Sequence, residues 1–251
     1  MSSSPLLVYG VPFSQPVRAV IWLLLLHKQP FKLVPINPGS KGDNGSRHPD
    51  FLAKNPAGTI PTIEEPETGF TLGEAHAILT YLCDRHGWSD VYPTDLHARA
   101  RIDAYLHFHH RNVREASVGL VAPKIRKDLN IPEAMQQMAQ RILTRALAAL
   151  ENGWLATSRF IEGDSVTIAD LAAYVEIGQL QPEFTNVFDF EAFPNVQRWL
   201  ADLHDVPHHD DVHAALVQLG DISQEAPPME KIRDANIAAM KVIQQRLAEW
   251  A

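Results

Sequence analysis

Ser14 stands where a short apolar run gives way to a helical pattern, a place at which a hydroxyl group can do chemistry. Pro16 suits the first turn of a helix, whose amide positions have no intrahelical partners. Those N–H groups and the helix dipole favour an anion, to which a nearby hydroxyl can donate a hydrogen bond. A thiolate is such an anion, and lowering a thiol pKa by about 2 units takes about 2.7 kcal/mol. The alternative is that Ser14 only caps the helix.

The elements that must position Ser14 follow one another within the first 87 residues. Short apolar runs predict strands, and apolar residues at helical spacing predict helices. In order they are a strand at 6–9, a helix at 16–28, a strand at 31–36, a short helix at 49–54, strands at 59–63 and 69–72, and a helix at 74–86 with Gly87 as its C-cap. This order, with Pro61 at the third strand, is typical of a thioredoxin-like domain.

Strand signals nearly vanish after residue 95. Residues 88–95 form a turn-rich connector, and helical spacing then predicts helices at 96–117, 132–154, 168–180, 196–204, 210–218 and 229–250. Thr167 and Asp170 form a variant of the capping box, with a structural role. We therefore expect an α/β plus all-α fold: an N-terminal thioredoxin-like domain (1–87), a linker (88–95) and a C-terminal α-helical bundle domain (96–251).

Composition excludes several classes of protein. The 22 Lys and Arg against 30 Asp and Glu give a net charge of −8, and the pI is near 5.8, which disfavours nucleic-acid partners and anionic membranes. The longest apolar run, residues 19–26, is too short to span a bilayer. Residues 1–5 lack the basic and apolar stretches of a signal peptide. We expect a cytoplasmic protein without membrane or nucleic-acid partners.

The single cysteine, Cys83, rules out an internal disulfide and two-cysteine redox chemistry. In a redox domain of this kind a Cys-x-x-Cys pair sits between the first strand and the first helix, where this chain has residues 13–16 (FSQP). No metal is expected either. His209 and His213 have the spacing of a zinc-binding helix, but Asp210 replaces the general base and no third ligand is evident.

Five segments resemble theta-class glutathione S-transferases, in the same order along the chain. They are residues 14–20 (SQPVRAV), 55–61 (NPAGTIP), 73–82 (GEAHAILTYL), 92–106 (YPTDLHARARIDAYL) and 167–171 (TIADL). The likeness is close over residues 6–114 and looser to residue 204. It implies that the first domain binds glutathione, that the helical domain supplies most of the second-substrate pocket, and that the chain forms a two-fold homodimer.

The resemblance also implies a mechanism. Ser14 would hydrogen-bond the glutathione sulfur and stabilise its thiolate, which attacks a small hydrophobic electrophile or reduces an organic hydroperoxide. In theta-like relatives an Arg on the first helix of the second domain assists, and the matching position is Arg114. The alternatives for Arg114 are an exposed charge or an ion pair between the domains.

Binding residues for the tripeptide follow from the same resemblance. Pro61 would be cis and would turn the Ile60 backbone toward the cysteinyl main chain of glutathione, as in strand addition. Glu74 would accept a hydrogen bond from the γ-glutamyl ammonium; the alternative is an acidic first-turn residue suited to the helix dipole. His48 or Lys41 could meet the glycyl carboxylate, or could simply be solvated.

A cleft between the two domains is where the electrophile would lie. His110 and Arg111 could face this cleft from the helical domain. Val11, Pro12 and Phe13 could form its other wall.

Two positions in the expected binding site depart from the family pattern. The family usually has a Ser after the Glu, and its hydroxyl and amide bind the γ-glutamyl carboxylate. Here Ala75 keeps only the amide, so one hydrogen bond of about 0.5–1.5 kcal/mol is lost. The residue before Ile60, often basic in relatives, is Thr59. Both departures favour an alternative function, a non-catalytic module of this fold that binds partners or hydrophobic ligands.

Overall fold

The computed structural model describes residues 4–250, so the expectation for the N-terminal residues 1–5 lies partly outside it. Its sheet has the strand order β2-β1-β3-β4. β1 (Leu6–Tyr9) runs parallel to β2 (Phe31–Val34) and antiparallel to β3 (Thr62–Glu65), and β3 pairs antiparallel with β4 (Phe70–Gly73). This mixed sheet is the one that the predicted thioredoxin-like order of elements requires.

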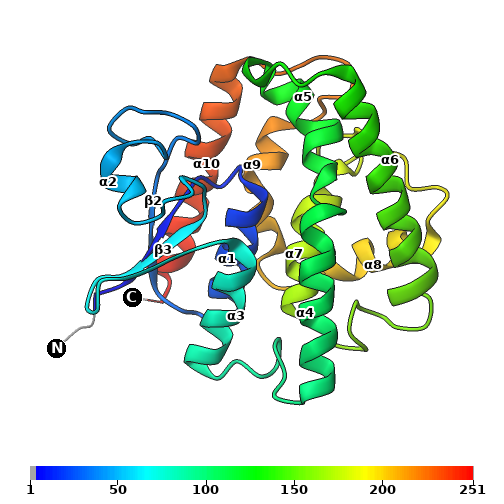
Figure 1. The fold of residues 1–251 in the computed structure, drawn as a ribbon, viewed down its shortest axis with the longest axis horizontal. Helices are drawn as coiled ribbons and strands as arrows, with labels where there is room; N and C mark the ends of the chain where they lie inside the picture. Colours follow the sequence, from blue (N-terminus) through cyan, green and yellow to red (C-terminus); the bar gives the residue numbers. More distant parts are fainter. Residues whose placement is uncertain (1–3, 251) are drawn as a thin grey trace.

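The described residues also form ten α-helices. They are α1 (Gln15–Leu26), α2 (Pro49–Leu52), α3 (Ala75–His86), α4 (Leu96–Arg111), α5 (Ala122–Ile125), α6 (Glu133–Ala149), α7 (Ile168–Ile177), α8 (Pro194–His204), α9 (His209–Leu219) and α10 (Met229–Ala248). Figure 1 shows the strands on the left, the long helices α4 and α6 on the right, and α1 between them. Within residues 4–250, every helix is too short or too polar to cross a lipid bilayer.

Several predicted bounds differ from the observed ones by a few residues, and for β3 and α4 local contacts give the reason. β3 begins at Thr62 rather than at residue 59, because the Thr59 carbonyl accepts a hydrogen bond from the Asn55 side chain at 3.0 Å and Pro61 has no amide to pair. α4 ends at Arg111 rather than at residue 117. There the Asn112 side chain bonds a carbonyl of the last turn, a local bond that competes with the helix.

α1 lies at the centre of one hydrophobic core that both parts of the molecule share. The helix is apolar nearly all round, as the pattern predicted, and it packs against α3, α7 and α9. Val17, Trp22 and Leu24 are fully buried. The Trp22 indole donates a hydrogen bond to the carbonyl of Pro207 at 2.8 Å. Because this core is continuous, the division into domains at residues 88–95 stays a prediction.

Gly10 lets the connection between β1 and α1 pass close to the helix. A Cβ atom at this position would lie 2.5 Å from a methyl carbon of Val17, which is fully buried and cannot move aside. The Gly10 amide donates to the carbonyl of Val34 at 3.0 Å, so the turn is also tied to β2. The path of the chain into Ser14 therefore depends on the absence of a side chain at residue 10.

The capping box at the start of α7 is present, which confirms its structural role. Asp170 is fully buried. One carboxylate oxygen accepts hydrogen bonds from the Ile161 amide and the Trp199 indole, both at 2.9 Å. The other accepts from the amide and the hydroxyl of Thr167, at 2.9 and 3.0 Å. Burial raises the pKa of Asp170, while these bonds oppose the shift.

Asp170→Ala should lower the free energy of unfolding by about 3–4 kcal/mol, because buried donors lose their acceptor and a cavity opens. The measurement is denaturant unfolding at neutral pH. Asp164→Ala, which removes an exposed carboxylate from the same connection, is the matched control. Equal losses in the two variants would contradict a special role for Asp170.

Candidate functional site

Ser14 is the N-cap residue of α1. Its backbone is extended, with φ −71° and ψ 123°, and its carbonyl accepts from the Arg18 amide at 3.0 Å. Its side chain makes no capping hydrogen bond, so the alternative of a purely capping serine is not what the structure has. The half-buried Ser14 hydroxyl thus lies at the positive end of the α1 dipole, unbonded to any group in residues 4–250.

The ring of Phe13 points into the core rather than toward a ligand. Phe13 is 7% exposed and belongs to the main hydrophobic cluster. Pro12 is buried and Val11 is half-buried. Phe13 therefore offers little apolar surface to the expected cleft. Its hydrogen bonds to other parts of the protein are made by its backbone.

A buried polar network joins the start of α1 to the helical part of the molecule. Gln15 donates from its side-chain amide to Gln179 at 2.8 Å, and its oxygen accepts from Arg114 at 3.2 Å. Arg114 pairs with Glu176, a buried carboxylate on α7. Glu176 also accepts from the hydroxyl of Ser117 at 2.7 Å. These bonds fix the first turn of α1, and Ser14 with it, relative to α7.

Arg18 is a fully buried cation one turn beyond Ser14. Its guanidinium donates to the carbonyl of Phe13 at 2.8 Å and to the carbonyl of Val175 at 2.9 Å. Burial lowers the pKa of Arg18 to about 9, and the nearby Glu176 carboxylate opposes that shift. Arg18 is therefore charged at neutral pH, and it ties the residue before Ser14 to the backbone of α7.

Arg114 does not lie on the first helix of the second domain, as was expected, but in the turn at residues 112–114 that follows α4. Its side chain is 39% exposed, whereas that of Glu176 is 2% exposed. Arg114 does form an ion pair, but its partner Glu176 lies on α7 in the same helical part, so the pair does not join the two domains as considered. The carboxylate offsets the charge of Arg114, and its guanidinium reaches Gln15, the neighbour of Ser14.

The Ile60–Pro61 peptide bond is cis, as predicted. The buried side chain of Asn55 organises the loop before it, donating to the carbonyl of Thr59 at 3.0 Å and to the hydroxyl of Thr62 at 2.9 Å. Among residues 4–250, no group pairs with the backbone N–H or C=O of Ile60. The loop thus offers a donor and an acceptor to an extended ligand.

Glu74 has a positive φ of 67° and exposes its carboxylate at the start of α3. A non-glycine residue in this conformation costs roughly 1–2 kcal/mol, so its surroundings must impose it. One constraint comes from Gly73, where a Cβ atom would lie 2.7 Å from the Asn55 side-chain nitrogen. Ala75 is the first residue of α3, and its amide belongs to the turn without intrahelical partners.

His48 and Lys41 are the residues considered for the glycyl end of a tripeptide, and Thr59 lies in the loop just before Ile60. The ring of His48 caps α2, accepting from the Asp50 amide at 3.3 Å. Lys41 is exposed in the loop before α2. The hydroxyl of Thr59 accepts from Asn55 at 3.3 Å. His48 and Thr59 are thus engaged within the protein, and their roles in binding stay predictions.

His110 and Arg111 are exposed at the end of α4, where two further histidines gather. The ring of His76, next to Ala75 on α3, lies 4.9 Å from that of His109 and 6.2 Å from that of His110. Burial lowers the pKa of His76 to about 4, helped by nearby positive groups. Burial also holds the pKa of His109 well below its usual value. Two neutral histidines, His76 and His109, therefore lie together between α3 and α4.

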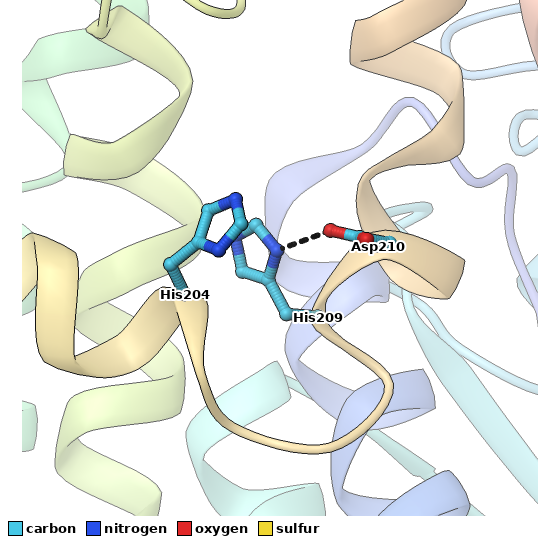
Figure 2. Close-up of side chains that lie close together, drawn as sticks. All are labelled: His204, His209 and Asp210. Atoms are coloured by element: carbon cyan, nitrogen blue, oxygen red, sulfur yellow. Dashed lines mark hydrogen bonds and ion pairs between the residues drawn. The ribbon is translucent and has the colours of Figure 1, made fainter.

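A second histidine cluster lies where α8 ends and α9 begins (Figure 2). His209 bonds Asp210 through Nδ1 at 2.8 Å and the Tyr174 hydroxyl through Nε2 at 2.7 Å, with His204 packed against its ring. His213 donates from Nδ1 to the carbonyl of His209 at 2.7 Å. Protein groups thus use both ring nitrogens of His209, which argues against reading these residues as a metal centre.

Known proteins share both parts of this architecture. Residues 8–90 match the family model for the glutathione S-transferase N-terminal domain, and residues 108–206 match that for the C-terminal domain. The chain is 32% identical over 228 residues to glutathione S-transferase T1 of Arabidopsis thaliana, which covers 84% of this chain and 89% of that protein. The chain belongs to the glutathione S-transferase family.

Theta-class proteins are among the relatives of this chain, which confirms the resemblance. Human glutathione S-transferase theta-2B is 33% identical over 192 residues, covering 74% of this chain and 75% of that protein. The solved structure of glutathione transferase F2 from Populus trichocarpa matches with a TM-score of 0.70 and 29% identity over 83% of this chain and 97% of that one. The chain spans only 39% of two longer Arabidopsis relatives, T3 and T2.

The sequence pattern did not identify the residues that hold the candidate site together. They are Arg18, Asn55, Glu176 and Gln179. Arg18, Glu176 and Gln179 did carry a signal, because each is a polar residue inside an otherwise apolar helical segment and must find a buried partner. Asn55 carried a weaker one, an Asn-Pro pair in the loop before a strand.

Acidification should destabilise this protein between about pH 6.5 and 4, because the unfolded chain binds a proton at His76 before the folded chain does. Stability from the neutral ring is present above the unfolded pKa and is lost as the pH falls to the folded one. His76→Gln should make that loss shallower, whereas Ala77→Gln, on an exposed position of the same helix, should not. Denaturant unfolding at pH 7, 6 and 5 measures the slope, and equal slopes would contradict the assignment.

Proposed function

We propose that this chain is a glutathione transferase in which the Ser14 hydroxyl donates a hydrogen bond to the glutathione sulfur. The thiol gives its proton to solvent, the sulfur forms a bond to the electrophilic carbon, and the leaving group departs with the electron pair it shared with that carbon. Small hydrophobic electrophiles are the proposed second substrates. The observation that carries the proposal is the uncommitted Ser14 hydroxyl at the start of a buried helix.

The energies are of the right size for this role. Bringing a thiol pKa down by about 2 units takes about 2.7 kcal/mol. A hydrogen bond to a charged sulfur contributes about 1.5–3 kcal/mol, and a helix N-terminus about 0.3–1 kcal/mol. These two contributions together are large enough, so the mechanism does not require a cation at the sulfur. Since Glu176 offsets the charge of Arg114, we assign Arg114 to holding Gln15 in place rather than to contact with the sulfur.

Three groups around the loop support a tripeptide subsite. The free N–H and C=O of Ile60 suit the cysteinyl main chain of glutathione. The exposed carboxylate of Glu74 suits the γ-glutamyl ammonium, and the first-turn amide of Ala75 suits the γ-glutamyl carboxylate. An imposed positive φ at Glu74 is the kind of backbone strain that gathers at ligand sites.

Three finer proposals rest on family membership. The thiolate would also reduce organic hydroperoxides by attacking the peroxide oxygen, which releases an alcohol and leaves a sulfenic acid. A second glutathione would convert that acid to glutathione disulfide and water. A two-fold homodimer and a cytoplasmic location are proposed on the same ground.

A non-catalytic binding module is the second candidate function. Ala75 favours it because the γ-glutamyl carboxylate loses a hydroxyl donor, and Thr59 favours it because its hydroxyl accepts from Asn55. Retention of the protein on immobilised glutathione without conjugation above the buffer rate would identify this function.

Ser14→Ala should lower the conjugation rate with a small aromatic electrophile at least tenfold at neutral pH, because less of the bound thiol is ionised. Binding of glutathione, measured by calorimetry, should change far less. Ser89→Ala removes an exposed hydroxyl outside the site and should leave the rate unchanged. Equal conjugation by the parent and Ser14→Ala would refute the mechanism.

Ala75→Ser should tighten glutathione binding by about 2- to 12-fold, because it adds one hydrogen bond to the γ-glutamyl carboxylate. Calorimetric titration with glutathione measures the change. Ala77→Ser, an exposed position two residues along the same helix, is the matched control. An affinity that changes equally in both variants would remove Ala75 from the binding site.

A further inference from the structure

Both peptide groups of Phe13 are held by residues outside the loop between β1 and α1. Its carbonyl accepts from the buried Arg18 guanidinium at 2.8 Å. Its amide donates to the side-chain oxygen of Asn236 at 2.9 Å, across 223 residues of sequence. Asn236 belongs to α10, which Figure 1 shows running alongside α9. The C-terminal helix therefore contacts the residue that immediately precedes Ser14.

The side chain of Asn236 is oriented for this contact. Its nitrogen donates to the carbonyl of Ile232, one turn earlier in α10, at 3.1 Å. A carbonyl can only accept, so the amide nitrogen must face Ile232 and the amide oxygen is left to face Phe13. The oxygen meets a backbone N–H that lies on a buried residue. Without Asn236, that N–H would lose its partner in a place where water has little access.

α10 is itself anchored firmly enough to act as a support. Ala235, Ala239 and Ile243 are buried on one face of the helix. Farther along, the Arg246 guanidinium makes two hydrogen bonds to the Asp211 carboxylate of α9, at 2.9 and 3.1 Å. A paired, two-point contact of this kind fixes geometry better than a single bond. Asn236 therefore links the position of α9 and α10 to the position of the loop between β1 and α1.

We infer that Asn236 is a positioning residue for Ser14: by holding the Phe13 amide, α10 sets where the Ser14 hydroxyl stands. This inference rests on the proposed role of Ser14 at the glutathione sulfur. Arg18 fixes the Phe13 carbonyl, Asn236 fixes the amide, and the buried ring fixes the side chain. With these three restraints the next residue has little freedom, so its hydroxyl needs no rearrangement to meet a thiolate.

The test compares Asn236→Leu, which removes the acceptor at similar volume, with Asn236→Asp, which keeps an acceptor oxygen. The thiolate of bound glutathione is titrated by its ultraviolet absorbance, and kcat and KM are measured separately. For Asn236→Leu we expect the pKa of the bound thiol to rise by roughly one unit and kcat/KM at neutral pH to fall roughly tenfold. The fall should lie in kcat, and Asn236→Asp should restore most of it.

Gln244→Leu makes the same amide-to-leucine change at an exposed position of α10 and is the matched control. It should leave the thiol pKa and kcat as in the parent. Amide hydrogen exchange gives a second readout: the Phe13 amide should exchange faster in Asn236→Leu than in Gln244→Leu. If Asn236→Leu does not fold, Asn236→Ala takes its place in every comparison.

Ser14→Ala separates the two levels of the argument. If Ser14→Ala leaves the bound-thiol pKa unchanged, the proposed function fails and the inference fails with it. If Ser14→Ala raises that pKa but Asn236→Leu and Asn236→Ala do not, only the role of Asn236 is overturned. A raised thiol pKa in Ser14→Ala and in Asn236→Leu, with a return toward the parent value in Asn236→Asp, supports the inference. A purely structural loss would not shift the thiol pKa in this way and would not be restored by an acceptor oxygen.

Discussion

The buried carboxylate of Glu176 is the charge on which the rest of the site depends. It lies on α7 and bonds Arg114 and Ser117, and it opposes the cost of burying Arg18. The fully buried Arg18 and the partly exposed Arg114 thus lie beside one buried anion where α1 meets the helical part. Such an arrangement tolerates the loss of a single partner poorly, because the remaining charge stays buried without compensation. The relation between the two parts of the molecule is therefore set by charge as well as by apolar packing.

The charge network around Glu176 affects the proposed chemistry at Ser14 through the first turn of α1. Gln15 joins the network on one side of Ser14, and the peptide groups of Phe13 are held on the other. The Ser14 hydroxyl contributes no hydrogen bond to this framework within residues 4–250. A hydroxyl that is free while its neighbours are fixed is preorganised for a ligand, because little energy goes into reorganising the protein when charge develops on that ligand.

The expected tripeptide subsite in the thioredoxin-like part is organised in the same way, with free groups held between fixed neighbours. The Asn55 side chain bonds the loop before Pro61 and also lies against Gly73, which leads into Glu74. The Asn55 side chain bonds to other groups of the protein, whereas the backbone of Ile60 and the carboxylate of Glu74 are left available to a ligand. The chain belongs to the glutathione S-transferase family, and beside Glu74 the first residue of α3, Ala75, offers only its backbone amide as a donor.

The cis proline at residue 61 was implied by the resemblance to the family. The sequence pattern by itself determined most of the strands and helices, the thioredoxin-like class, the capping box at Asp170 and the place of Ser14 at a helix start. Each depends on neighbours within a few residues, and local spacing encodes them. Only the tertiary structure decided that Arg114 leaves its helix to pair with Glu176, that Arg18 reaches Val175 across 157 residues, and that Asn236 reaches Phe13. Partners so distant in sequence meet through the packing of whole elements, which local spacing does not specify.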